Sequence, residues 1–585
     1  MHLLYILAIP LTAVLAHALP SQKQQQQQQH HLSAETYLAI DKVLNAFSFA
    51  VDARPVDPTA FSQIFAPNAW MNLQQESSPQ IGIESITAAF VDLLPKYRTQ
   101  HSFGTKSIVL NADGIPRRYL TSQAAAIRPW IPVAARRQRP VIHDPPSDSK
   151  GVTGILSNWV RDVQLDDVPQ ELIERTKYIL LDGIASITAE CCAFEWVSFE
   201  LDDLHKDAPW HACSVIIPAL FAAIEHDSGT SSAKHSGKSF LLSTIVGFEL
   251  GGRIGRALHG TDMLSRGWHS GAVFGPPAAA AAVSKQLGLS PRQIEDSFGT
   301  ACTQSSGLMS AQFEAMAKPM QHGLASRNGL FAALLSKDNY TGIDKVFERH
   351  YGGYLDMFSQ GTKLTPQNKP YEMTQKLGED WSSLCNISIK PYASMAGTHG
   401  PTDCIVNLQE KYTQHFQDPS KIKKINIVQH KAWYGHGGQD ITRPITVLGG
   451  QMSTKYCVAA QLLDRAVLPA QFTTANLNRD GIWQLIEKVE CECDPSFDQS
   501  KRWATRVSIH FHDGTCLKEE SEGPRTTHSP LSNLEIVEKY RRLADTCVDP
   551  ARRARIEGLV LNIESLEDVR DLTRALEGRT RCSVT

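Results

Sequence analysis

A series of long amphipathic segments beginning near Val152 constrains the fold of this chain most strongly. The segments repeat apolar residues at helical spacing, with proline or serine near several starts and glycine near several ends, as helix capping favours. Because an amphipathic helix must bury its apolar face, such a run predicts one large helical domain. The expected helices span residues 154–163, 169–185, 239–258, 276–287, 291–305 and 323–336.

The pattern changes after Ser388, where apolar and polar residues begin to alternate. The two-residue period of half-buried strands is found at 425–429, 486–493 and 505–513, and helical periodicity returns at 532–545 and 550–559. We therefore expect an α+β domain inserted into a helical one. The predicted bounds are 151–384 for the helical domain, 385–526 for the inserted domain and 527–585 for C-terminal helices that return to the first.

Residues 33–114 form a separate region with mixed periodicity. A helical pattern over 34–51 precedes a proline-punctuated stretch, a second helix over 84–94 and a strand over 105–110. This order, and the segment 37–70 in particular, resembles the start of a SnoaL-like α+β cone. The long strands that complete such a cone do not follow, so a partial cone is expected. Residues 115–150, basic and rich in proline, are interpreted as a linker.

The N-terminus and the cysteines indicate different compartments. Residues 1–18 have an apolar stretch ending in Ala16-His17-Ala18, which is typical of a secretory signal peptide, and residues 19–32 form a glutamine-rich tract expected to be a disordered linker. All 12 cysteines lie at or after Cys191, without paired metal-binding spacing, which favours free thiols in an intracellular protein. The compartment therefore stays open between the secretory pathway and the cytoplasm or mitochondrion.

The overall charge and hydrophobicity exclude two classes of protein. Lysine and arginine number 58 against 61 acidic residues, a net charge of −3, whereas a nucleic-acid-binding domain carries a basic surface. The hydrophobic content is 42%, and no stretch approaches the roughly 18 uninterrupted apolar residues of a membrane-spanning helix. We expect neither a nucleic-acid partner nor a membrane span.

Cofactor and metal motifs are not supported by the sequence. Ser236-Gly237-Lys238-Ser239 imitates the end of a phosphate-binding loop but lacks its earlier glycine, and no metal-ligand spacing such as HExxH is found. Gly251, Gly252 and Gly255 lie within an apolar helical run, where close helix packing explains them better than a dinucleotide site. Neither a cofactor nor a metal is expected.

Histidine, lysine, aspartate and tyrosine recur instead in loops at helix boundaries. His269 precedes a helix expected to start at Pro276, and the N-terminus of a helix, with its free N–H groups and partial positive charge, suits a substrate carboxylate. The loops of interest span residues 200–211, 267–277, 316–325, 389–401 and 450–456.

Five segments together resemble the MmgE/PrpD family, which includes 2-methylcitrate dehydratase and cis-aconitate decarboxylase, and are most similar to its fungal, itaconate-forming branch. The resemblance covers about residues 150–580. It implies a cofactor-independent lyase, active as a homodimer on a di- or tricarboxylate, with its site between the helical domain and a smaller lid domain. The segments are GWHSGAVFGPPAAAAA, ACTQSSGLMSAQF, KPMQHGLASRNG, ERHYGGYLDMF and GQMSTKY.

The resemblance also implies which residues form the site. The residues implied as catalytic are His269, Lys318, His211 and Tyr456, and those implied as substrate-binding are Lys390, Asp202, Asp203 and Gln451. The residues themselves leave simpler roles open: the two aspartates could cap the following helix, Tyr456 could belong to the core, and Lys390 could be a solvated strand end. His322 and His399 are expected to be satisfied local hydrogen-bonding residues.

Three positions depart from the family pattern. The stretch between Ile187 and Glu200 is shorter than in relatives, Pro319 follows the pocket lysine, and Met395 stands where some relatives have a lid histidine. Decarboxylation of cis-aconitate or a related unsaturated tricarboxylate is the leading hypothesis. Dehydration of 2-methylcitrate or an alkyl citrate, an inactive binding protein on the same scaffold, and a gene model that fuses two unrelated proteins are the alternatives.

Overall fold

The computed structural model describes residues 145–192, 200–228, 234–313, 317–497, 501 and 503–577, together with four two-residue strands nearer the N-terminus. The chain forms two units, one of residues 1–107 with 128–130 and one of 108–127 with 131–585. The strands pair as two antiparallel ladders, β1 (Trp70–Met71) with β2 (Gln80–Ile81) and β3 (Val109–Leu110) with β4 (Pro116–Arg117). The predicted signal peptide, the glutamine-rich linker and the rest of the partial cone lie outside the described residues.

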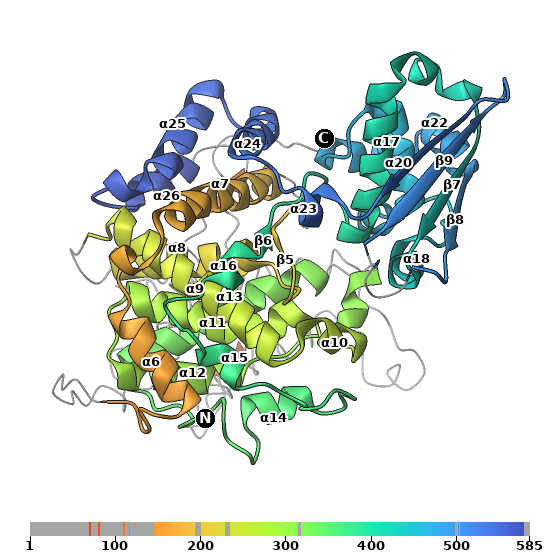
Figure 1. Ribbon diagram of the computed structural model, residues 1–585. Coiled ribbons are helices and arrows are strands. Elements are labelled where there is room, and N and C mark those ends of the chain that lie inside the picture. Colours follow the sequence, from red (N-terminus) through yellow and green to blue (C-terminus); the bar gives the residue numbers. More distant parts are fainter. Residues whose placement is uncertain are drawn as a thin grey trace. The chain divides into compact units, whose positions relative to one another are not determined.

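Helices make up most of the second unit up to residue 385, as expected (Figure 1). The helices are α6 (Val152–Asp162), α7 (Gln170–Cys192), α8 (Ala212–Ser228), α9 (Gly237–Ala257), α10 (Gly260–Ser265), α11 (Ser270–Gln286), α12 (Pro291–Cys302), α13 (Ala317–Lys337), α14 (Tyr354–Ser359), α15 (Tyr371–Thr374) and α16 (Ser382–Cys385). Helix α11 lies at the centre and contacts α8, α9, α12 and α13.

Two helices begin earlier than the sequence predicts. Helix α11 starts at Ser270, six residues before the predicted start, and it contains Pro276 and Pro277 within its length. Helix α13 starts at Ala317, so that Pro319 lies in its first turn, where the backbone N–H that proline lacks would have no partner within the helix. Both corrections move a predicted site residue from a loop to the N-terminal end of a helix.

The glycines of α9 allow close packing, as predicted. A side-chain carbon added at Gly251 would lie 2.1 Å from the Trp210 ring, and one added at Gly255 would lie 2.1 Å from Ala208. Any larger residue would therefore push α9 away from the loop that precedes α8.

A four-stranded sheet forms the core of the part between residues 391 and 526. Its strand order is β10-β9-β7-β8, with β7 parallel to β8 and the other pairs antiparallel. Helices α17 and α20 lie along one face of the sheet (Figure 1). The elements are α17 (His399–Lys411), β7 (Ile422–Gln429), α18 (Lys431–Gly437), α19 (Val447–Met452), α20 (Thr454–Asp464), α21 (Thr474–Leu477), α22 (Asp480–Ile486), β8 (Val489–Cys493), β9 (Thr505–Phe511), β10 (Cys516–Ser521) and α23 (Arg525–His528).

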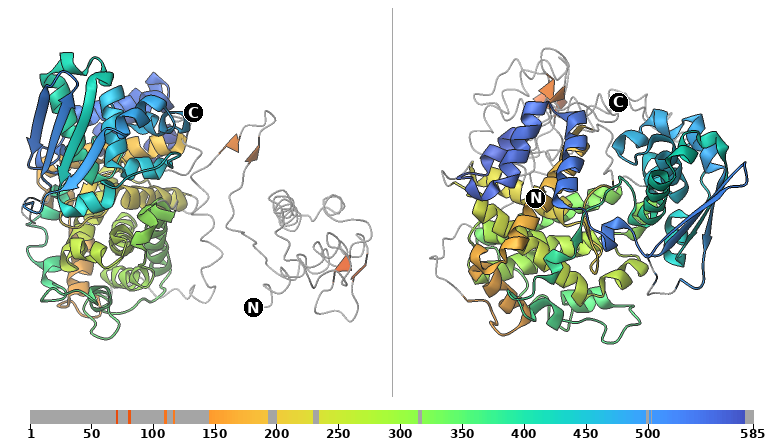
Figure 2. Two further views of the ribbon diagram at one scale, coloured as in Figure 1. Left: turned by 90° about the vertical axis from the view of Figure 1, so that its right-hand side faces the viewer. Right: turned by 45° about the horizontal axis from the view of Figure 1, so that its top comes forward.

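The chain then returns to the helical part. Helix α24 (Asn533–Cys547) packs against α7, and α25 (Pro550–Leu561) and α26 (Arg570–Leu576) lie beside it (Figures 1 and 2). A second connection is short: β5 (Leu204–His205) pairs antiparallel with β6 (Ile387–Ser388), just before the chain enters the sheet part. Both connections converge on the loop that begins at Glu200.

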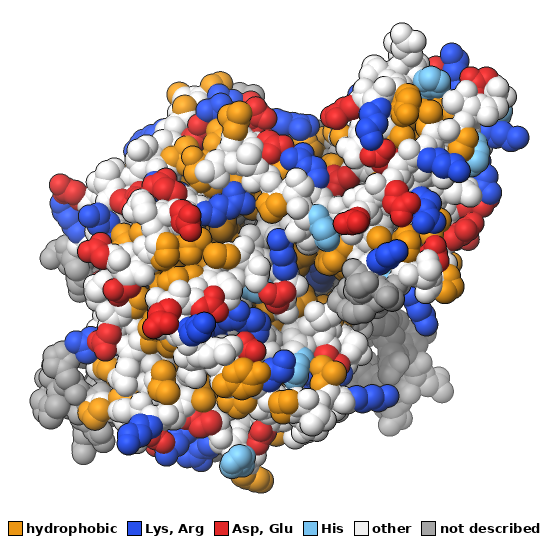
Figure 3. Space-filling model, viewed as in Figure 1, with side chains coloured by type: hydrophobic (Ala, Val, Ile, Leu, Met, Phe, Trp, Pro, Cys, Tyr) orange, Lys and Arg blue, Asp and Glu red, His pale blue; other side chains and the backbone are white. Residues whose placement is uncertain are grey.

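The surface carries charges of both signs. Basic and acidic side chains are interspersed over the face shown in Figure 3. Among the described residues, no helix combines the length and apolar character needed to cross a bilayer.

A buried ion pair joins α7 to the returning α24. The Lys539 ammonium lies 2.5 Å from the Asp182 carboxylate and donates to the carbonyl of Leu201 at 3.1 Å. Burial, followed by the nearby charges of Asp203 and Asp202, raises the pKa of Asp182 to about 6 even with Lys539 beside it. Through this hydrogen bond, Lys539 fixes the position of Leu201 in the loop that contains Glu200 and Asp202.

Replacing Lys539 with methionine is expected to destabilise the fold by about 3–5 kcal/mol, because it leaves Asp182 buried without a counter-ion. Because the folded-state pKa of Asp182 is above its ordinary value of 3.8, its contribution to stability falls as pH rises from about 4 to about 6. Because Lys539 lowers the pKa of Asp182, its removal should raise that pKa and extend the loss of stability to higher pH. Urea denaturation at pH 5 and pH 8 measures both effects. Lys234→Met, which breaks the exposed pair with Glu567, is the control and should cause no comparable change.

Candidate active site

The loop from Glu200 to His211 supplies the acidic side of the site. The Asp203 carboxylate accepts hydrogen bonds from the backbone N–H groups of Ala212 and Cys213, both at 2.8 Å, and so caps α8. The Asp202 carboxylate accepts from the Ser214 hydroxyl at 3.2 Å and lies 3.3 Å from His211 Nδ1. Asp203 therefore has the capping role that the sequence left open. Asp202 contacts site residues directly.

Lys390 enters from the segment after β6. Its ammonium donates to the carbonyl of Glu200 at 3.1 Å, and lies 3.5 Å from the Glu200 carboxylate and 3.6 Å from that of Asp202. Lys390 is only 1% exposed, so it is not a solvated strand end. Burial lowers its pKa, while the charge of Asp202 acts in the opposite direction.

Lys318 approaches the same carboxylate from the first turn of α13. Its ammonium forms an ion pair with the other oxygen of Glu200. Burial and the neighbouring positive charge of Lys390 lower the pKa of Lys318 to about 7. A lysine with such a pKa can hold or release a proton near neutral pH.

Three histidines extend the site away from the lysines. The His322 ring lies between the other two, with centroids 4.9 Å from His269 and 5.0 Å from His211. His269 is the residue before the first turn of α11, and His211 immediately precedes α8, where its Nδ1–H donates to the Asp203 carbonyl at 2.6 Å. The N-terminal ends of α8, α11 and α13 therefore meet around these side chains.

His269 and His322 have unused hydrogen-bonding capacity. Within the part of the chain that the structure describes, neither His269 Nδ1 nor His322 Nε2 has a hydrogen-bond partner, although both atoms are buried. Burial first, and His211 second, lower the pKa of His269 to about 4, and burial followed by the charge of His269 lowers that of His322 well below its ordinary value. Both rings are therefore neutral near pH 7.

His322 does not behave as the sequence predicted. The satisfied local hydrogen-bonding role expected for it is wrong, because its Nε2 has no partner among the described residues and its ring lies edge-on to His211 and tilted against His269. Its position four residues after Lys318, one helical turn away on the same face, was the available signal. Glu200 is the other site residue that the prediction missed. His399 is confirmed as satisfied, with its ring nitrogens bonded to the Thr526 hydroxyl and the Ser394 carbonyl.

The remaining two predicted residues lie in the sheet part. Tyr456 packs against Phe472, and its hydroxyl donates to the Gln471 carbonyl at 2.6 Å. The Gln451 side chain donates to the Ala393 carbonyl at 3.2 Å, while its amide oxygen is buried without a partner among the described residues. These contacts hold α19 and α20 in place, and they do not join either residue to the lysines and histidines.

Two of the three departures from the family pattern lie in the described part of the chain. The backbone N–H of Met395 donates to the Gln451 carbonyl at 3.0 Å, and its sulfur accepts from the N–H of Gly397 at 2.9 Å. Pro319 lies next to Lys318 in the first turn of α13. The short connection before Glu200 falls on residues 193–199, outside the described residues.

We refer to Glu200, His211, His269, Lys318, His322 and Lys390 as the lysine–histidine cluster. Its lysines and helix N-termini provide the positive potential and hydrogen-bond donors that a polycarboxylate requires. In the described ranges, no three histidine, cysteine or acidic side chains are grouped so that they could hold a metal ion.

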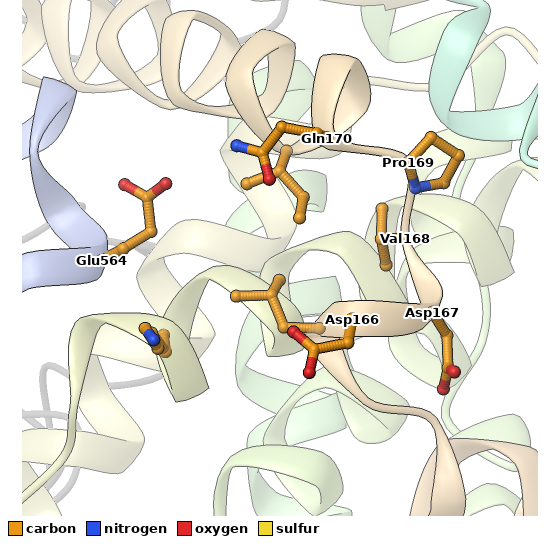
Figure 4. A pocket seen from close by; sticks show the side chains of 9 residues that line it. Asp166, Asp167, Val168, Pro169, Gln170 and Glu564 are labelled. Atoms are coloured by element: carbon orange, nitrogen blue, oxygen red, sulfur yellow. The ribbon is translucent and has the colours of Figure 1, made fainter.

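A separate cavity lies away from this cluster. It has a volume of about 650 Å³ and is lined by nine residues, among them Asp166, Asp167, Gln170 and Glu564 (Figure 4). Its lining includes no predicted site residue. Because it has three carboxylates and one lysine, Lys238, it is unsuited to an anionic substrate.

Known proteins resemble this chain over most of its length. The family model of the MmgE/PrpD N-terminal domain matches residues 192–367. The family model of the MmgE/PrpD C-terminal domain matches residues 392–565. The cis-aconitate decarboxylase-like protein oryM of Aspergillus oryzae is 41% identical over 470 residues, which cover 73% of this chain and 97% of that protein.

Two cis-aconitate decarboxylases are also similar. That of Aspergillus terreus is 38% identical over 473 residues, covering 73% of this chain and 96% of the relative. That of Homo sapiens is 24% identical over 385 residues, covering 65% of this chain and 77% of the relative. The N-terminal match includes Glu200, His211, His269, Lys318 and His322, and Lys390 lies two residues before the C-terminal match begins. The chain belongs to the MmgE/PrpD family.

Proposed function

We propose that this protein is a cofactor-independent carboxy-lyase that decarboxylates cis-aconitate or a closely related unsaturated tricarboxylate. The observation that carries the proposal is its 38–41% identity to cis-aconitate decarboxylase and a decarboxylase-like protein over 96–97% of their lengths. The lysine–histidine cluster supports it, because two buried lysines beside converging helix N-termini suit a substrate with three negative charges.

The reaction needs one proton and a place for one electron pair. When the carboxylate on the saturated carbon leaves as CO2, its bonding pair forms a new terminal double bond. The original double bond then shifts its electrons onto the far carbon, beside another carboxylate. Protonation of that carbon gives itaconate, so the balance is cis-aconitate plus a proton to itaconate plus CO2. The site must therefore stabilise the developing charge and supply a proton.

Lys318 is the proposed proton donor, because its pKa of about 7 permits proton transfer near neutral pH. Lys390 is proposed to bind a substrate carboxylate. Asp202 is proposed to orient both Lys390 and His211. Neutral His269 and His322 would surround the departing carboxylate with weakly solvating groups. Asp203 supports the loop through its cap on α8. Tyr456 and Gln451 would act from the sheet part, which we propose as the lid of the site.

A comparison of two substrates tests the proposed reaction. The full-length chain is given cis-aconitate and, separately, 2-methylcitrate, and CO2 and unsaturated products are quantified. The proposal predicts CO2 from cis-aconitate in equal amount to itaconate. Water loss from 2-methylcitrate without CO2 release from cis-aconitate would instead support the dehydratase. Inertness of well-folded protein toward both would support a binding role.

The predictions about assembly and the N-terminal region need separate measurements. We propose a homodimer, which light scattering on the purified protein would test. N-terminal sequencing of the mature chain would test cleavage after residue 18. Sequencing the transcript across the codons for residues 110–200 would show whether the partial cone and the lyase belong to one gene.

A further inference from the structure

Glu200 has an unusual position between two buried lysines. Its side chain is nearly buried, at 4% exposure, and one oxygen contacts Lys318 while the other lies 3.5 Å from Lys390. Its φ of +51° is in the left-handed region, which costs a non-glycine residue roughly 1–2 kcal/mol. The contacts with the two lysines hold this conformation.

The neighbouring acids are bonded differently. Asp203 accepts from two backbone N–H groups, and Asp202 accepts from the Ser214 hydroxyl and contacts His211. The described contacts of the Glu200 carboxylate, in contrast, are the ammonium groups of Lys318 and Lys390. These are the same groups that a substrate carboxylate would use.

The main chain around Glu200 is fixed independently of its side chain. Lys390 binds the carbonyl of Glu200, and Lys539 binds the carbonyl of Leu201. Because these anchors involve only backbone oxygens, the carboxylate can leave the lysines through side-chain rotation while the loop stays in place.

We propose that Glu200 is an internal competitor of the substrate, whose carboxylate occupies the position between Lys318 and Lys390 that a substrate carboxylate takes by exchange. Without Glu200, the buried Lys318 would lose its described counter-ion and Lys390 would keep only Asp202, so Glu200 stabilises the two lysines, and a polycarboxylate ligand must displace it. The ligand class is a small di- or tricarboxylate. Only the identity of the natural substrate rests on the proposed function.

Calorimetry on the full-length protein tests the proposal by measuring the binding of tricarballylate, a saturated tricarboxylate. Glu200→Gln removes the competing charge and should bind tricarballylate at least about tenfold more tightly than the wild type. The variant should also have a lower melting temperature without ligand and a larger ligand-induced rise. Glu295→Gln, which changes another fully buried glutamate in α12, is the control and should leave the affinity unchanged.

A second variant protects the test against failure to fold. Glu200→Asp keeps the charge but shortens the side chain, so it should fold and still bind tricarballylate more tightly than the wild type. Unchanged or weaker binding in the folded variants would overturn the proposal, and a catalytic role for Glu200 would appear as a lower kcat without tighter binding. The assay does not depend on decarboxylation, so tighter binding without CO2 release would contradict only the proposed function.

Discussion

Replacing Lys318 with methionine is expected to reduce kcat for cis-aconitate by at least about 100-fold, because a positioned general acid contributes 10²–10⁴-fold to a rate. Methionine keeps much of the volume of lysine but carries neither charge nor proton. The Lys318 ammonium contacts Glu200 and, by the exchange proposed above, would contact the substrate once Glu200 moves away. Initial rates of CO2 release at saturating substrate measure the effect.

The control is Lys177→Met, a lysine on α7 whose side chain is 8% exposed and whose partners are Glu174 and Glu564. It should retain nearly full activity. The pH profile gives an independent check. A donor with a pKa of about 7 is protonated below that pH, so wild-type kcat/KM should be highest on the acid side and fall as pH rises through about 7. A Lys318→Met enzyme with normal kcat would exclude this residue as the proton donor.

Replacing His269 with phenylalanine is expected to lower kcat/KM by about 100-fold. The substitution retains an aromatic ring but removes Nδ1, a buried atom that has no partner in the described structure and is available to the substrate. Because the pKa of His269 is lowered to about 4, its ring is neutral in the free enzyme. The fold reduction in kcat/KM caused by His269→Phe should therefore be nearly constant between pH 6 and pH 8, whereas the reduction caused by Lys318→Met should change with pH.

His235→Phe is the matched control for this substitution. His235 has a similar exposure but lies beside Asp227 and Gln286, away from the cluster. Its replacement should leave kcat/KM within about twofold of the wild type. If His269→Phe were as active as His235→Phe, His269 would have no place in the proposed site.

The sequence predicted the helical framework well because local signals determine it. Ser290 and Pro291 mark the start of α12, and the predicted strand at 425–429 is the buried middle and end of β7. The start of α11 is earlier than predicted because Pro276 suggests a helix start, whereas the helix begins at Ser270. Helix α13 begins at Ala317, before the predicted start at Gly323, and includes Pro319 in its first turn. Those extensions bring His269 and Lys318 to helix ends.

The site was only partly predictable, since its electrostatics depend on contacts between distant segments. The motifs implied Lys318 and Lys390, but the sequence has no sign that both contact Glu200, which is 118 residues from the first and 190 from the second. Burial then gives Lys318 and His269 the pKa values that the proposed chemistry uses. For the same reason, the Asp203 cap could be offered only as an alternative.

Proton NMR of cis-aconitate incubated with the full-length protein in D2O tests the central claim most directly. The account predicts itaconate in equal amount to the CO2 released, with one deuterium on its saturated carbon, and almost none of it with Lys318→Met. Unchanged cis-aconitate in the presence of folded wild-type protein, or a hydrated product without CO2, would contradict the account.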